Sequence, residues 1–169
     1  MNIFYLDKDP MLAAKYHCDA HVRKMVVEYS QLLSTAWHIL KPDSGKELYK
    51  PTHVNHPCSV WVRSNPANYD WLYVCLFWLH REYLFNYNNH NASYRLIGSL
   101  KENPFDSYKP SIDKDFSEPP LAMPDYCKIG DAVESYREYY RREKADLLVY
   151  KFRYAPHFLS PRYECNNNN

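Results

Sequence analysis

Hydrophobic residues recur at steps of three and four positions over residues 10–38. This spacing puts them on one side of an α-helix, and the set comprises Val22, Met25, Val26, Tyr29, Leu32, Leu33 and Ala36. Asp9 followed by Pro10 is a typical helix start, with the aspartate as N-cap and the proline in the first turn. The pattern therefore predicts one long helix from Pro10 to about His38. Residues 2–6 are apolar and predict a short strand or an extended segment on the core.

Further helices follow from similar signals. Residues 64–66, Ser-Asn-Pro, form a second cap-and-proline start. The helix after them reaches about residue 87 and is apolar on most sides, as is typical of a central core helix. Shorter helices are predicted at residues 57–63 and 92–102. Asp131 with Glu134 resembles a capping box and predicts a helix that ends near residue 149.

The proline-rich stretch at residues 103–130 shows little periodicity. A connection of this length without secondary structure is more often a functional lid or binding loop than a simple link. We expect a mainly α fold, with one compact helical domain over residues 1–165, an aromatic and basic C-terminal segment, and a disordered tail at 166–169.

Composition narrows the class of protein. Hydrophobic residues make up 46% of the chain and aromatic residues 17%, which excludes a disordered chain. Five cysteines without a C-x-x-C spacing, and a start that lacks a charged and apolar leader, predict a cytoplasmic protein. The most apolar stretch, residues 71–79, is too short to span a bilayer, so no membrane association is expected. No cofactor is expected either, and the oligomeric state is not predicted.

A polar stripe follows the first predicted helix. At 100° per residue, the side chains in it fall within about 60° of one another, and they are His17, His21, Lys24 and Glu28. Three interpretations stay open. The stripe is catalytic, with a carboxylate as acid or base and a lysine as nucleophile; or His17 and His21 bind a metal; or the stripe is a solvated face or a buried polar network.

A second cluster contains His53 and His56. The residue before a proline is held extended, so the ring of His56, which precedes Pro57, is expected to point away from the loop into a cleft. Trp61 and Arg63 follow closely. The alternative is a well-bonded loop with Trp61 in the core.

Bases alternate with aromatic residues near the C-terminus. Arg137, Tyr140, Arg141 and Lys144 belong to this segment, with residues 150–154 behind them. Such a pattern suits a nucleic-acid surface, where cations meet phosphates and rings stack on bases. The alternative is a solvated helix with ion pairs such as Glu138–Arg142.

Several motifs carry a resemblance to known proteins. They are residues 1–10 (MNIFYLDKDP), 17–22 (HCDAHV), 31–36 (QLLSTA), 55–57 (NHP) and 122–125 (AMPD). With the tyrosine-rich C-terminal helix, they look like a family of small, mostly uncharacterised proteins encoded by phages and other large DNA viruses. The resemblance covers nearly the whole chain and implies a virus-encoded protein located in the host cell cytoplasm.

The chain also distantly resembles pyrimidine-dimer DNA glycosylases of the endonuclease V type, which are compact all-α proteins. The resemblance rests on the N-terminal segment and its helix, on Asn55-His56-Pro57 and on the aromatic, basic C-terminus. It implies that Glu28 is the catalytic carboxylate and that His17, His21 and Lys24 line the site. It also implies that Arg63 and residues 137–153 contact phosphates.

One departure from these glycosylases concerns the nucleophile. They attack with an N-terminal amine that is exposed after Met removal, whereas the bulky Asn2 is expected to leave Met1 in place. Either the α-amine of Met1 acts, or Lys24 forms the Schiff base, or no lyase chemistry occurs. The basic residues around the catalytic glutamate are also replaced, here by Val26, Val27 and Tyr29.

The leading hypothesis is a protein that acts on DNA or nucleotides, most concretely a DNA glycosylase or lyase. Glu28 would be the acid or base, Lys24 or the Met1 amine the nucleophile, and His17, His21 and His56 would orient the substrate. The predicted substrate-binding residues are His53, His56, Trp61, Arg63, Arg137, Tyr140, Arg141 and Lys144. One alternative is a non-catalytic pocket for a nucleotide or another phosphate-bearing small molecule, which would sequester a host signal. The other is a metal-dependent enzyme that uses His17, His21 and His56.

Overall fold

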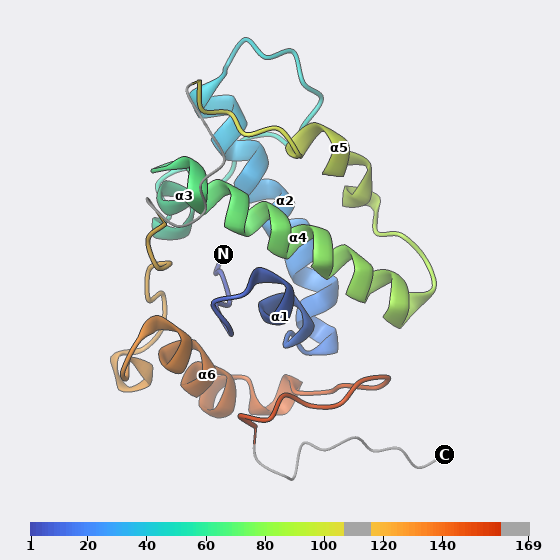
Figure 1. Ribbon diagram of the computed structural model, residues 1–169, viewed down its shortest axis with the longest axis vertical. Helices are drawn as coiled ribbons and strands as arrows, with labels where there is room; N and C mark the ends of the chain where they lie inside the picture. The colour runs from blue at the N-terminus through green and yellow to red at the C-terminus, as the bar shows by residue number, and fades with distance from the viewer. Residues whose placement is uncertain (107–115, 160–169) are drawn as a thin grey trace.

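Two helices of 22 residues each, α2 (Asp19–Leu40) and α4 (Pro66–Tyr87), pack against each other at the centre of the protein (Figure 1). The apolar side chains of α2 that were predicted to form the core are all at most 1% exposed. α4 contributes Leu72, Cys75, Leu76 and Leu79, which are fully buried. The three- and four-residue spacing in both helices therefore does mark the core.

The computed structural model describes residues 1–106 and 116–159, and these form six α-helices and no strand. The prediction of a mainly α, single compact domain is confirmed for this part of the chain. The predicted tail at 166–169 lies outside the described residues. Besides α2 and α4, the α-helices are α1 (Pro10–Lys15), α3 (Pro57–Val62), α5 (Ile97–Leu100) and α6 (Ala132–Glu143).

The predicted helix starts are confirmed by their caps. The carboxylate of Asp9 accepts hydrogen bonds from the backbone of Met11 and Leu12, and the side chain of Asn65 accepts one from Asn68. Asp131 accepts one from Glu134. Each cap satisfies backbone N–H groups that have no partner inside the helix, which stabilises a helix by about 1 kcal/mol.

The prediction of one long helix over residues 10–38 is wrong. The chain leaves the helical conformation after Lys15, and Cys18 is extended with φ −66° and ψ 162°. A distant segment supplies the reason, because the amide of Asp19 donates to the carbonyl of Val149 and its carboxylate accepts from the amide of Lys151. These bonds start a second helix at residue 19, and they leave His17 in the break between α1 and α2.

Two other predicted boundaries differ from the structure. In place of the helix predicted over residues 92–102, the chain forms a 3-10 helix, Ala92–Leu96, and the short helix α5, which ends at Leu100. Gly98 and Ser99 disfavour a longer helix. The last helix, α6, ends at Glu143, and a 3-10 turn, Ala145–Leu147, follows it. There the chain turns back toward the start of α2.

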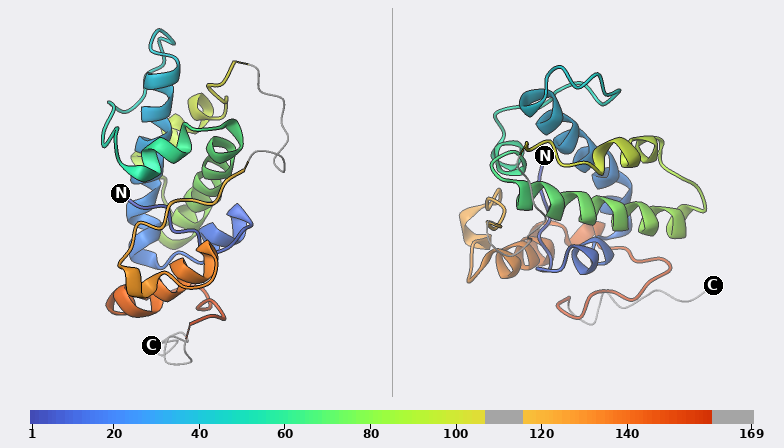
Figure 2. Two further views of the ribbon diagram at one scale, coloured as in Figure 1. Left: turned by 90° about the vertical axis from the view of Figure 1, so that its left-hand side faces the viewer. Right: turned by 45° about the horizontal axis from the view of Figure 1, so that its top comes forward.

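Residues 2–6 are extended and cross the interior without forming a strand (Figure 2). The amide of Phe4 donates to the Tyr29 hydroxyl at 3.0 Å. The Asn2 side chain donates to the Ala122 carbonyl at 2.8 Å and accepts from the Tyr136 hydroxyl at 2.8 Å. The segment thus joins α2, α6 and the proline-rich stretch.

The proline-rich stretch is described on both sides of residues 107–115, and those nine positions lie outside the described residues. Its second part packs on the helices, since the Trp61 indole donates to the Ser117 carbonyl at 2.8 Å. It also contains the 3-10 turn Asp125–Cys127. In the described part of the chain, no helix is both long enough and apolar enough to cross a membrane.

Arg153 anchors the C-terminal segment to the start of α2 and to α4. Its guanidinium donates to Asp19 at 2.9 Å and to Glu82 at 3.1 Å, and also to the carbonyls of Lys15 and His17. The side chains of Arg153 and Glu82 are each only 12% exposed. This arginine therefore bridges two carboxylates that are shielded from water.

We expect Arg153→Ala to lower the free energy of unfolding by about 3 kcal/mol, because it leaves two shielded carboxylates without their cation. Urea denaturation followed by circular dichroism measures the change. Arg142→Ala is the matched control, since Arg142 is 55% exposed and pairs with Glu138 at the surface; its effect should stay within about 0.5 kcal/mol. Equal effects of the two variants would show that the Arg153 bridge does not stabilise the fold.

Candidate functional site

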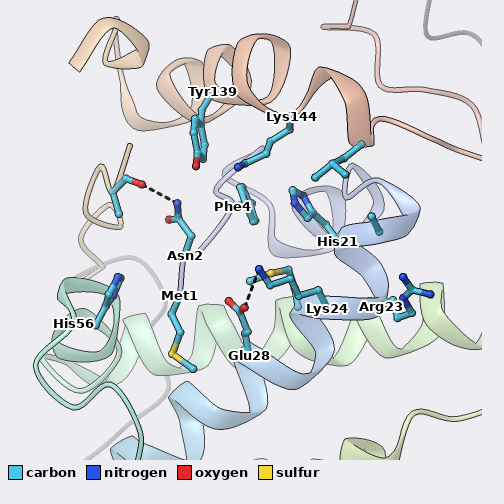
Figure 3. Close-up of a pocket in the computed structure, with 14 residues that line it drawn as sticks. Met1, Asn2, Phe4, His21, Arg23, Lys24, Glu28, His56, Tyr139 and Lys144 are labelled. Atoms are coloured by element: carbon cyan, nitrogen blue, oxygen red, sulfur yellow. Dashed lines mark hydrogen bonds and ion pairs between the residues drawn. The ribbon is translucent and has the colours of Figure 1, made fainter. Parts of the chain in front are cut away.

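An open cavity of about 720 Å³ lies between the N-terminal half of α2, the N-terminal segment, the start of α3 and the end of α6. Figure 3 shows the polar side chains that surround it, which are Asn2, His21, Arg23, Lys24, Glu28, His56, Tyr139 and Lys144. Met1, Phe4, Met25 and Leu147 complete much of the wall. Pockets of this size hold small molecules or a single nucleotide unit.

Three residues of the predicted stripe do face this cavity. His21, Lys24 and Glu28 are separated by three and four positions on α2, so they share one side of the helix. The ammonium of Lys24 lies 3.4 Å from a carboxylate oxygen of Glu28. Lys24 is 67% exposed and Glu28 only 17%. The amine therefore extends into solvent at the mouth, and the carboxylate sits deeper.

His17 does not line the cavity. It is fully buried, and its two ring nitrogens contact the Ala13 carbonyl at 2.7 Å and the Tyr29 hydroxyl at 3.0 Å. Burial lowers its pKa to about 4. His17 was predicted to lie at the site with the other stripe residues, but the break before α2 turns its ring into the core, away from this cavity. The stripe is thus divided between a face that lines the cavity and a buried polar network.

His21 is a neutral hydrogen-bonding group at neutral pH. Its Nδ1 lies 2.6 Å from the Tyr140 hydroxyl, and its ring stacks on Phe4 with centroids 4.3 Å apart. Burial, together with the charges of His17, Lys144 and Lys24, lowers the pKa of His21 to about 3. Two ammonium groups of the cavity therefore lie close enough to act on this ring.

His56 borders the cavity from the start of α3. Its backbone is extended before Pro57, as predicted, with φ −65° and ψ 137°. Its Nδ1 accepts from the Cys58 amide at 3.2 Å and so caps α3. Burial lowers the pKa of His56, and the positive charges of the Met1 amino group and of His53 lower it further. The Met1 amino group therefore lies near this ring.

Four of the predicted substrate-binding residues belong to the basic and aromatic C-terminal segment. Of these four, only Lys144 lines the cavity. Tyr140 is buried on His21, Arg137 binds Asp7 and the Leu6 carbonyl, and Arg141 binds Glu138. α6 is thus an ion-paired helix packed on the N-terminal segment, and its guanidinium groups are occupied within the fold.

The remaining predicted substrate-binding residues lie apart from the cavity. His53 is exposed with φ 49°, and its ring contacts the hydroxyl of Thr52. Trp61 is buried in the core, as the alternative interpretation held. Arg63 donates to the Val54 carbonyl and to Ser59.

The proposed metal ligands do not come together. His17 has both ring nitrogens engaged in the core, whereas His21 and His56 border the cavity. Over residues 1–106 and 116–159 no group of three or more His, Cys, Asp or Glu side chains could hold a metal ion. The three-histidine site is therefore not formed.

Sequence reasoning missed Asn2, Phe4, Arg23 and Tyr139. Arg23 does not belong to the predicted stripe, because its angle on the helix differs from that of Lys24 by 100°. Tyr139 and Tyr140 are adjacent and of the same type, so the sequence alone did not indicate that Tyr139 faces the cavity while Tyr140 is buried. The apolar residues at the start of the chain predicted that Phe4 packs on the core, but not that it lines a cavity.

No protein-family model, curated protein or solved structure matches the chain. What the cavity does therefore has to be inferred from its own residues.

We expect protonation of the buried histidines to destabilise the fold at acid pH. The pKa of His17 is lowered to about 4, whereas an unfolded histidine ionises near 6.5. Between these values the unfolded chain binds a proton that the folded chain does not, so the free energy of unfolding falls by about 1.4 kcal/mol per pH unit as pH decreases. His21 adds to this slope down to a pH of about 3.

Urea unfolding at several pH values from 7 to 4 measures the slope. His17→Gln should make it less steep by about one proton, because the buried group that titrates is gone. His157→Gln, at an exposed position, is the control and should leave the slope unchanged. A slope that is the same in all three proteins would contradict the assignment.

Proposed function

We propose that the cavity is the active site of a base-excision type DNA glycosylase or lyase. One observation carries the proposal: amino groups and a partly shielded carboxylate, Glu28, border the same open cavity. An amine and a carboxylate side by side are the two groups that Schiff-base chemistry at a sugar carbon requires.

The amine is the nucleophile. Lys24 is 3.4 Å from Glu28, and the amino group of Met1 is the second candidate on the cavity wall. The nitrogen adds to the C1′ aldehyde of an abasic sugar. The carbonyl oxygen leaves as water and a protonated imine remains, so the protein is joined to the DNA by a C–N bond.

Glu28 is the acid and base. Its carboxylate takes the proton from C2′ of the imine, the electron pair forms a C2′–C3′ double bond, and the 3′ phosphate leaves with the electrons of the C3′–O bond. Water then hydrolyses the imine and restores the amine. Proton transfer by a positioned group contributes about 10² to 10⁴ in rate.

The surrounding groups position a nucleotide. Arg23 and Lys144 are cations at the cavity and suit its phosphates. Tyr139, with the Lys144 ammonium 4.7 Å from its ring centre, offers a face for a sugar or base. His21, being neutral, can donate or accept one hydrogen bond at the deep end.

The first test is borohydride trapping. The protein is mixed with a duplex that contains one abasic site, and borohydride reduces any imine to a stable amine that is seen as a covalent adduct on a denaturing gel. We expect an adduct, and we expect Glu28→Gln to slow strand cleavage at least about 100-fold. Glu47→Gln, an exposed carboxylate outside the cavity, is the matched control.

Mapping the adduct by peptide mass spectrometry identifies the amine. An adduct on Lys24 that disappears in Lys24→Ala assigns that side chain, and an adduct on Met1 that survives Lys24→Ala assigns the α-amine. Absence of an adduct, together with no effect of Glu28→Gln, would sink the lyase.

A second function is favoured by the charge around the cavity. Among the described residues that line it, Arg23, Lys24 and Lys144 face one carboxylate, Glu28. That excess of cations suits a free nucleotide or another phosphate-bearing small molecule, held without chemistry.

A thermal-shift and urea-unfolding screen with nucleoside mono-, di- and triphosphates tests this second function. A ligand at 100 times its Kd should raise the free energy of unfolding by about 2.7 kcal/mol. Lys144→Ala should weaken the effect, and Lys101→Ala, outside the cavity, should not. If every nucleotide leaves the unfolding midpoint unchanged, the cavity is not a nucleotide-binding pocket.

A further inference from the structure

A second groove, of about 500 Å³, lies where α1, the C-terminal half of α4 and the segment at residues 153–154 meet. It shares no lining residue with the cavity described above. Every apolar residue in its lining is aromatic: Tyr16, Trp78, Phe85 and Tyr154. The proposed chemistry at Glu28 makes no use of this surface.

One face of α4 builds most of the groove. Trp78, Arg81 and Phe85 are separated by three and four positions and so lie on the same side of the helix. Phe85 is 62% exposed, and Tyr154, from the opposite wall, is 90% exposed. Exposed rings gathered in this way on a water-facing surface indicate a binding site.

The groove is also cationic. The one acidic side chain among the described residues that line it, Glu82, pairs with Arg153 at 3.1 Å, and Arg153 also binds Asp19. Lys15 and Arg81 are exposed, and neither has a carboxylate within ion-pair distance among the residues the structure describes. The ammonium of Lys15 lies 6.0 Å from the centre of the Trp78 ring. A planar ligand that stacked on the Trp78 ring would therefore place any negative charge that it carries next to Lys15.

We propose that this groove binds unpaired nucleotides of a nucleic-acid strand. Bases stack on Trp78, Phe85 and Tyr154, and the phosphates between them bind Lys15 and Arg81. Aromatic platforms next to cations are how single strands are held without regard to sequence. Trp78 and Phe85 are about 10.5 Å apart along the helix axis, so their rings would take separate bases of the strand.

The composition of the groove favours a strand over a peptide helix. Grooves that take amphipathic helices bury rows of side chains in hydrophobic pockets. This groove has no aliphatic apolar residue in its lining, and its rings and charges alternate. An acidic peptide would satisfy Lys15 and Arg81 but would leave the exposed rings without flat partners.

The test is fluorescence anisotropy with a labelled twelve-nucleotide thymidine strand at low and moderate salt. Phe85→Ala and Tyr154→Ala should each weaken binding about tenfold, since stacking on one ring is lost. Arg81→Glu should weaken it and reduce the salt dependence by about one phosphate contact. All three positions are exposed, so the fold is kept. The controls are Tyr126→Ala and Lys101→Glu, an exposed ring and an exposed cation outside the groove.

Two results would overturn the proposal: equal affinity of the groove variants and the unchanged protein for the strand, or binding of an acidic peptide, and not of the strand, that depends on Phe85 and Arg81. The inference does not depend on the lyase chemistry. A failed borohydride trap, with strand binding that still depends on Phe85 and Arg81, therefore rejects only the proposed reaction.

Discussion

Residues 2–6 run extended through the interior, where each backbone amide and carbonyl needs a partner that is not water. The Tyr29 hydroxyl accepts from the Phe4 amide and also contacts His17, and the Tyr136 hydroxyl donates to Asn2. These buried tyrosines join the segment to α2 and α6. The segment in turn forms one wall of the cavity, so the placement of the site depends on these few hydrogen bonds.

The same network explains why two of the histidines are neutral. A charged imidazole in this interior would lose its hydration, and burial lowers the pKa of both His17 and His21 accordingly. His17 then serves as a hydrogen-bonding brace between α1 and α2. His21 keeps one edge at the cavity, where a neutral ring stacks on Phe4 and contacts Tyr140.

The molecule presents two surfaces of different chemistry. The cavity beside α2 combines amines, one shielded carboxylate and a few rings, which suits a reaction or tight binding at one nucleotide. The groove along α4 combines exposed rings with free-standing cations, which suits sequence-independent contact with a strand. Arg153 connects the two regions structurally, because it holds the C-terminal segment against both Asp19 at the start of α2 and Glu82 in the groove.

Local information in the sequence determined most helices and their starts, because caps and three- and four-residue spacing act over a few neighbouring residues. It also singled out His21, Lys24, Glu28 and His56, which line one cavity in the structure; the first three share a helix face, and Pro57 constrains the backbone of the fourth. Only the tertiary structure decided the break at His17, which depends on hydrogen bonds from a segment about 130 positions away. The tertiary structure likewise decided which basic side chains form ion pairs, because many of these pairs join elements whose packing no local pattern encodes.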